Sequence, residues 1–167
     1  MPRDYGPKGF NFVFVYTREA HPGENFPAHR SMEQKLSCAR TFKKEFGIER
    51  PILVDDLVGT GHKLYGTLPN MTYLVSHTGQ ILFRADWTDP FTIEAALNYV
   101  LASRARRAEG LRLAPFYAEF AGYRWNDMAK FREGLARAGQ QAVQDFAKAM
   151  KRWAQGPRRP GRIELNE

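Results

Sequence analysis

The sequence predicts an α/β fold, in which helices flank both faces of a mixed β-sheet, followed by a basic helical extension. Short apolar runs rich in β-branched and aromatic residues alternate with segments whose apolar residues recur every three or four positions. A glycine-containing connection of hairpin length separates two of these runs, so parallel and antiparallel neighbours are both expected. With 167 residues, 43% of them hydrophobic, the chain is long enough for one sizeable core. We expect one domain over residues 1–102 and an extension over residues 103–167.

Residues 11–16 are apolar on both faces and predict a strand at or near the centre of the sheet. Residues 17–30 contain two prolines, one glycine and two histidines, and they predict a loop that is long enough to be functional. Ser31 has the character of a helix N-cap, with Gln34 three residues later. The helix that follows ends at Gly47. Its single apolar stripe consists of Met32, Leu36, Ala39, Phe42 and Phe46.

The middle of the chain predicts three further strands and one helix. Residues 51–55 predict a short buried strand, and residues 57–65 predict a weaker helix that contains two glycines. Residues 71–76 and 80–85 flank the sequence His-Thr-Gly at 77–79. This pattern predicts two antiparallel strands joined by a short turn.

Asp89 followed by Pro90 predicts the start of another helix. Its buried side is formed by Ile93, Leu97, Val100 and Leu101. Beyond Ser103 the arginine-rich residues 104–107 and Gly110 are expected to interrupt this helix. The extension then predicts amphipathic helices around residues 115–121, 127–137 and 141–153, and a loose end over 156–167.

All of the net charge of +7 lies in the extension. Residues 1–102 hold 11 Lys and Arg against 11 Asp and Glu, whereas residues 103–167 hold 14 against 7. A basic segment can bind nucleic acid or an anionic surface, but a solvated helical face has the same composition. Because no nucleic-acid motif accompanies the charge, the sequence favours a solvated face and predicts no specific nucleic-acid partner.

Several classes of function are excluded by what the sequence lacks. Its one cysteine, Cys38, cannot form an internal disulfide, a CxxC redox pair or a cysteine-built zinc site, and its helical position is typical of a small buried hydrophobe. No apolar run approaches the ~20 residues of a membrane helix, so we expect a soluble, cytoplasmic protein without a membrane partner. Phosphate-binding loops and dinucleotide fingerprints are also missing. The sequence predicts no cofactor.

The predicted order of strand, helix, strand, helix, hairpin and helix is that of the later part of a thioredoxin-like fold. In that fold the first strand lies in the middle of the sheet, between the strands that correspond to residues 11–16 and 71–76, and the nucleophile follows it. Residues 1–9 contain two prolines and two glycines and no apolar run. We therefore expect this domain to be incomplete at its N-terminus.

Three segments between Phe12 and about Leu101 resemble one known family. Residues 15–22, Val-Tyr-Thr-Arg-Glu-Ala-His-Pro, are similar to a strand that ends in a Glu-Ala-His turn, and residues 29–36, His-Arg-Ser-Met-Glu-Gln-Lys-Leu, are similar to a histidine just ahead of a helix. Residues 51–73 are similar to the strand, helix and proline turn that follow. Together these segments resemble the iodothyronine deiodinases and their bacterial relatives among the redoxins.

The resemblance implies a thiol or selenol oxidoreductase with a small-molecule substrate and a thiol reductant. Its cysteine or selenocysteine nucleophile would lie upstream of Met1, so the chain as given is expected to be inactive. The resemblance places Glu19, His21 and His29 among the catalytic residues, where an imidazole that titrates near neutrality can transfer a proton and a nearby carboxylate can hold one tautomer. It places Tyr16, Pro69 and Arg84 at the substrate, although residues 83–89 depart from the glycine-rich pattern of the animal enzymes.

An upstream selenocysteine codon, usually taken as a stop, would explain a gene start at Met1. Residues 1–10 resemble the end of the helix that follows the nucleophile. We expect an open frame upstream that encodes an apolar strand leading into TGA or a cysteine codon.

Other interpretations stay open at this point. Glu19 with the two loop histidines matches no helical metal motif, so metal binding is the less favoured use, and histidines without a function are a third. His62 and His77 are expected to be exposed, Asp55 and Asp56 to cap the next helix, and Pro69 could be the cis-proline of thioredoxin-like folds. The alternative function is a non-catalytic interaction module that uses the basic extension. Homo-oligomerisation is a further option.

Overall fold

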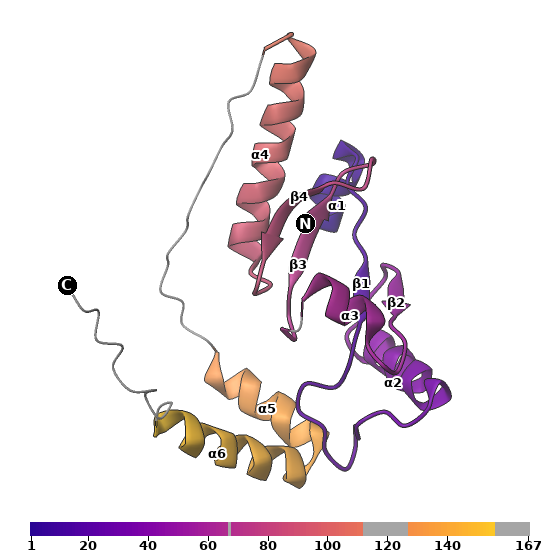
Figure 1. Ribbon diagram of the computed structural model, residues 1–167, viewed down its shortest axis with the longest axis vertical. Helices are drawn as coiled ribbons and strands as arrows, with labels where there is room; N and C mark the ends of the chain where they lie inside the picture. The colour runs from indigo at the N-terminus through magenta and orange to yellow at the C-terminus, as the bar shows by residue number, and fades with distance from the viewer. Residues whose placement is uncertain (67, 112–126, 156–167) are drawn as a thin grey trace, which may run out of the picture. The chain divides into compact units, whose positions relative to one another are not determined.

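The computed structural model describes residues 1–66, 68–111 and 127–155, and within them the chain is a mixed α/β protein (Figure 1). The predicted strands and helices form in the expected order, and a short helix precedes them. The helices are α1 (Pro2–Tyr5), α2 (Met32–Glu45), α3 (Thr60–Tyr65), α4 (Pro90–Ala108), α5 (Met128–Ala138) and α6 (Gln140–Ala154). The strands are β1 (Phe14–Tyr16), β2 (Ile52–Val54), β3 (Thr72–Val75) and β4 (Ile81–Ala85).

The strands form two separate two-stranded sheets within the described residues. β1 runs parallel to β2, with Val15 opposite Leu53, and β3 runs antiparallel to β4, with Leu74 opposite Phe83. The ladder of β3 and β4 shifts by one residue after Leu74. The expected central position of residues 11–16 is therefore not observed, because β1 pairs on one side only.

The two helix starts that the sequence predicts are confirmed. The Ser31 hydroxyl accepts a hydrogen bond from the Gln34 amide at 3.1 Å, and the Gln34 side-chain oxygen accepts one from the Arg30 amide at 2.8 Å. At α4 the Asp89 carboxylate accepts from the Thr92 amide at 2.6 Å. The bonds accepted by Ser31 and Asp89 satisfy amides that the first turn of a helix leaves without an intrahelical partner.

The predicted interruption at residues 104–107 is wrong, since α4 continues to Ala108. Arginine and alanine are strong helix formers, and cationic side chains in a last turn interact favourably with the helix dipole. The break falls at Gly110, whose φ of +77° lies in the left-handed region that glycine adopts readily.

The first ten residues pack against α4. Tyr5, Ile93 and Leu97 form a buried cluster, and Leu97 is fully buried. The Tyr5 hydroxyl donates to the Asn98 side-chain oxygen Oδ1 at 2.9 Å, with the Glu94 carboxylate at 3.3 Å. The partly buried apolar residues around this cluster are Met1, Phe10, Phe12, Leu74 and Leu101. Residues 1–9, for which the sequence predicts no strand, thus form a helical turn and contribute Tyr5 to the core.

Two of the three helices predicted in the extension are confirmed as α5 and α6, which we call the helical hairpin. Gly139 joins them with a φ of +121°. Leu135, Ala138 and Ala142 form a buried cluster between the two helices. The predicted helix at 115–121 and the predicted loose end at 156–167 lie outside the described residues. No helix within the described ranges has the length and apolar character of a membrane span.

The described chain divides into two compact units. The first contains residues 1–18 and 30–111, and the second contains residues 19–29 together with the helical hairpin. A division of the chain at residue 102 separates residues 19–29 from the hairpin, whereas in the structure these segments pack together.

Leu97→Ala should destabilise the first unit by roughly 2–5 kcal/mol, because it removes a fully buried side chain and leaves a cavity. The matched control is Leu64→Ala, since Leu64 is 79% exposed and its truncation should change stability by less than about 0.5 kcal/mol. Urea unfolding followed by circular dichroism measures both values. Equal effects of the two substitutions would contradict the assigned core.

Candidate functional site

The predicted catalytic residues lie on the segment 19–29, which we call the site loop. Its two ends approach each other, and His29 Nε2 lies 3.8 Å from Glu19 Oε1. This distance fits an ion pair when His29 is protonated, but it is longer than a hydrogen bond. The His29 side chain is only 5% exposed and that of Glu19 23%, so solvent screens the pair less than it screens a surface pair. The structure thus brings together two of the three predicted catalytic residues.

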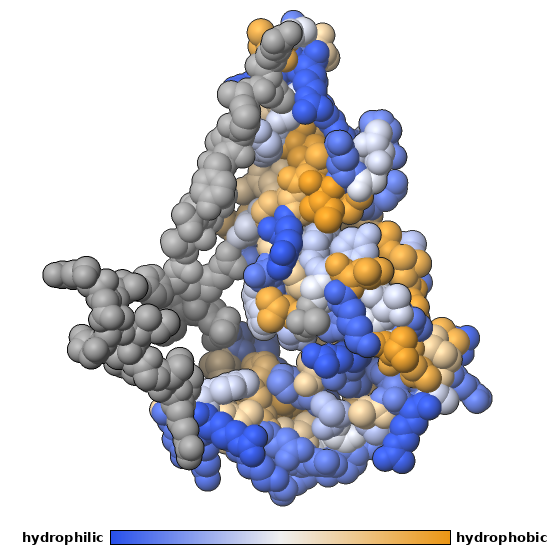
Figure 2. Space-filling view, viewed as in Figure 1, coloured by the Kyte–Doolittle hydropathy of each residue, from blue (hydrophilic) through white to orange (hydrophobic). Residues whose placement is uncertain are grey.

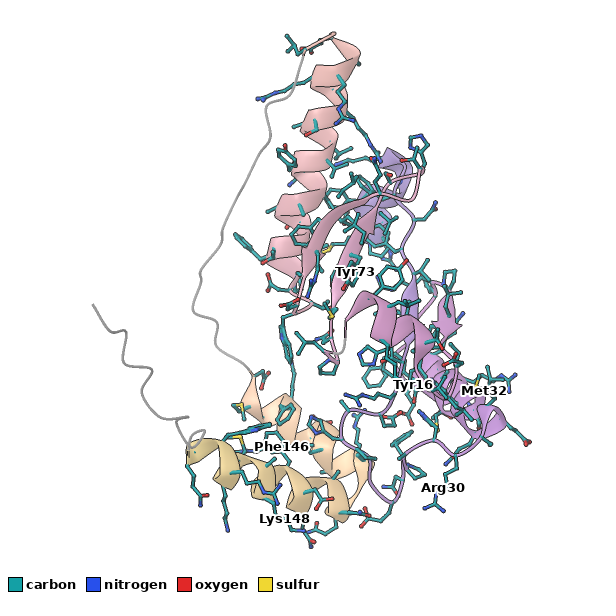
Figure 3. The ribbon with its side chains drawn as sticks, viewed as in Figure 1. Tyr16, Arg30, Met32, Tyr73, Phe146 and Lys148 are labelled. Atoms are coloured by element: carbon teal, nitrogen blue, oxygen red, sulfur yellow. The ribbon has the colours of Figure 1, made fainter. Side chains whose placement is uncertain are left out.

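His21 lies elsewhere on the loop, in an aromatic setting. Its ring meets Phe131 of α5 and Phe146 of α6 edge to face, at centroid distances of 5.8 and 5.5 Å. Phe131 and Phe146 in turn contact each other at 4.9 Å. Figure 3 shows Phe146 on the side of α6 that faces α5, whereas Lys148 points away. The partners that the structure gives to the His21 ring are aromatic side chains of the hairpin.

The three predicted substrate residues lie on the first unit. Tyr16, at the end of β1, stacks at a tilt on Phe42 of α2, with ring centroids 6.1 Å apart. The Arg84 guanidinium on β4 pairs with the Asp86 carboxylate at 2.8 Å. Pro69 is exposed, and since the described chain contains no cis peptide bond, the interpretation of Pro69 as a cis-proline is wrong.

Sequence reasoning missed Lys35. This lysine is 1% exposed, and its ammonium group donates to the Asp56 carbonyl oxygen at 2.8 Å. Burial lowers the pKa of Lys35, and the nearby carboxylates of Asp55 and Asp56 oppose this shift. A signal was present in the sequence, because Lys35 is four residues before Ala39 and therefore shares the buried face of α2 with it. The predicted apolar stripe of α2 is only partly buried, since Met32, Leu36 and Phe46 are exposed.

Asp55 and Asp56 cap α3, as the sequence predicts. One Asp55 carboxylate oxygen accepts from the Gly61 amide at 2.9 Å and from the Asp56 amide at 3.0 Å, and the other accepts from the His62 amide at 2.9 Å. The Thr60 amide donates to Asp56 at 2.9 Å. Burial acts to raise the pKa of Asp55, but the three amide donors outweigh it and hold the pKa below its ordinary value.

The remaining titratable side chains take structural positions. His62 is half-buried rather than exposed, and its Nε2 lies 3.0 Å from the Leu68 carbonyl oxygen. His77 is exposed in the turn between β3 and β4, as expected, and Cys38 is half-buried on α2. Among the described residues, no three histidine, cysteine or acidic side chains gather closely enough to hold a metal ion.

The comparisons with known proteins found no match for this chain among protein-family models, curated proteins or solved structures. The fold itself defines the chain as a mixed α/β protein.

Asp55→Asn should lower the unfolding free energy by about 1 kcal/mol at pH 7, because it replaces an acceptor oxygen of the cap with an NH₂ group. The folded-state pKa of Asp55 lies below its unfolded value of about 3.9, so the stability it contributes is present above that pH and is lost as the pH falls through the folded value. The difference between variant and wild type should thus shrink below about pH 4.

Urea unfolding at a series of pH values measures this difference. Asp86→Asn, which alters an exposed carboxylate outside the cap, is the control. A constant difference from pH 7 to pH 2 would contradict the assigned role of Asp55.

Proposed function

We propose that the chain is most of a deiodinase-like redoxin, a thiol or selenol oxidoreductase of thioredoxin-like fold whose nucleophile lies on a strand and helix upstream of Met1. One observation supports this proposal above the others: β1 and β3 are each hydrogen-bonded on one side only, within the described residues. In this proposal β1 and β3 correspond to the two strands between which a thioredoxin-like fold has its nucleophile-bearing strand.

The open edge of β1 follows from its hydrogen bonds. The Phe14 amide donates to the Pro51 carbonyl at 3.0 Å, and the Asp55 amide donates to the Tyr16 carbonyl at 3.1 Å. Because the backbone groups of successive strand residues point to opposite edges, the amide and carbonyl of Val15 point away from β2. An additional strand parallel to β1 would pair with these groups.

The face of this small sheet that carries Val15 is uncovered as well. Phe14 and Tyr16 point to the other face, where they contact Phe42 of α2. The side chains of the uncovered face are about half exposed: Val13 is 49%, Val15 56% and Leu53 58% exposed. Figure 2 shows apolar atoms open at the surface of this unit. A helix that followed the added strand would cover them, as helices cover both faces of a sheet with parallel strands.

In the proposed chemistry, Glu19 and His29 serve the nucleophile. With hydrogen peroxide, the thiolate or selenolate attacks one oxygen, the O–O bond breaks, and the leaving hydroxide takes a proton from the imidazole and departs as water. The resulting sulfenic or selenenic acid is reduced by two thiols, which become a disulfide and release a second water. With an aryl halide, the nucleophile takes the halogen, the ring carbon takes the proton, and two thiols regenerate the nucleophile with release of the halide and a disulfide.

A comparison of two chains tests this proposal. Thiol-dependent peroxide reduction and reductive dehalogenation are assayed on residues 1–167 and on a chain extended in frame through the upstream nucleophile. We expect activity from the extended chain alone. There, His29→Ala should lower kcat by about 10²-fold or more because it removes the proton donor, whereas His77→Ala, which alters an exposed turn, should not.

Activity of the short chain, or of an extended chain whose nucleophile is replaced by serine, would overturn the proposal. Size-exclusion chromatography and thermal melting separate it from the alternative of a non-catalytic interaction module. Open strand edges predict that residues 1–167 associate with themselves or aggregate, and that the extended chain does not. A cooperative, monomeric short chain would favour the interaction module.

A further inference from the structure

We propose that the helical hairpin is the positioning element of the candidate site. It holds the site loop through His21, Gly23, Glu24 and Asn25, so that Glu19 and His29 meet as the acid–base pair while His21 serves as the anchor. This inference rests on the proposed function for the chemistry of the pair, but the contacts on which it is built lie entirely within the second unit.

Asn25 satisfies the C-terminal end of α5. Its side-chain amide donates to the Arg137 carbonyl at 2.9 Å, and its backbone amide donates to the Ala138 carbonyl at 3.1 Å. The last carbonyls of a helix have no intrahelical partner, so these two bonds supply what α5 lacks. Asn25 is more than a hundred residues away in the sequence, and the contact therefore fixes the loop to the hairpin.

Glu24 satisfies the N-terminal end of α6. The N-cap of α6 is Gly139, which has no side chain for capping. The Gln141 amide instead donates to the Glu24 carboxylate, at 2.9 Å from Oε1 and 3.1 Å from Oε2. A carboxylate at this position also interacts favourably with the positive end of the helix dipole. One short stretch of the loop thus caps both helices at the turn that joins them.

The loop can approach this closely because residue 23 is glycine. Gly23 is buried, and a Cβ atom built on it would overlap the Ala138 carbonyl oxygen and lie 3.2 Å from the Ala142 Cβ. The first of these contacts is with backbone, which cannot move aside without breaking the turn. Gly23 is therefore required for the contact itself.

His21 adds a second attachment point on the other side of Gly23. Its ring contacts one phenylalanine from each helix, Phe131 and Phe146, so it spans the hairpin. An imidazole held edge-on by two aromatic rings is placed by packing. Of the two loop histidines, the one near a carboxylate is His29, and we assign the proton transfer to His29 and the positioning role to His21.

The test uses residues 1–167 and measures amide hydrogen exchange over residues 19–29, together with the NMR shifts of the His21 ring protons. Glu24→Ala should speed exchange of the loop about five-fold through loss of a cap, and Glu24→Gln, which keeps one acceptor oxygen, should lie between it and wild type. Phe146→Leu keeps an apolar side chain of similar size but should move the His21 ring shifts toward those of exposed His77. Glu49→Ala, at an exposed glutamate of the first unit, is the control.

Gly23→Ala provides the variant that leaves every side chain of the hairpin in place. Loss of loop protection while β3 and β4 keep theirs supports the inference, whether or not α5 and α6 loosen at the same time, because the loop and the hairpin then form one unit. Unchanged exchange of residues 19–29 in Gly23→Ala, Glu24→Ala and Phe146→Leu would overturn it.

These readouts require no catalysis, so an inactive extended chain would overturn the proposed function and the proton transfer by His29, but it would leave the positioning of the site loop by the helical hairpin standing. If the extended chain is active, Glu24→Ala should lower kcat with little change in KM, and Glu24→Gln should restore part of it. A kcat unaffected by Glu24→Ala would contradict the positioning role even if the loop loosened.

Discussion

A β-strand has hydrogen-bonding groups on both edges, and the organisation of this protein depends on the fact that, among the residues that the structure describes, β1 and β3 each pair along one edge only. The amide of Val15 points away from β2, and the side chains of Val15 and Leu53 are left open on the same sheet. An unpaired edge next to an uncovered apolar face is unfavourable in water and promotes association with other chains. A strand added at this place would pair with the open edge, and the helix after it would cover the apolar face. For this reason we favour a redoxin with its nucleophile upstream.

The second unit is organised by contacts between the site loop and the ends of the two helices of the hairpin. The last carbonyls of α5 have no intrahelical partner, and α6 starts at a glycine that has no side chain for capping. Asn25 of the site loop donates to the end of α5, and its neighbour Glu24 accepts from the start of α6. The loop in turn gains a fixed conformation, which a segment rich in proline and polar residues would not adopt by itself. The basic extension thus holds the site loop in place. Its surface charges are partly paired within the helices, as in Arg137 with Glu133 and Lys148 with Asp145.

A buried cation near the end of β2 gives the first unit a comparable constraint. Lys35 ties α2 to the turn between β2 and α3 through the Asp56 carbonyl, while Asp55 caps α3. Burying an ammonium group is unfavourable unless it is well compensated, and the contact places the lysine at one defined spot. The start of α2, just after His29, is thereby held against the strand ends.

The sequence by itself determined the features whose causes are local: the caps at Ser31 and Asp89, the buried side of α4 and the turn at Gly79 all depend on residues within a few positions of one another. It did not determine the packing of Tyr5 on α4, because that contact depends on a partner almost a hundred residues away. It also did not determine the extent of α4, which depends on several weak helix preferences acting together. The catalytic roles of the site loop were an expectation from resemblance. Only the tertiary structure decided that Glu19 meets His29 and that His21 packs between two phenylalanines of the extension, since no spacing in a sequence encodes which distant helix ends a loop will cap.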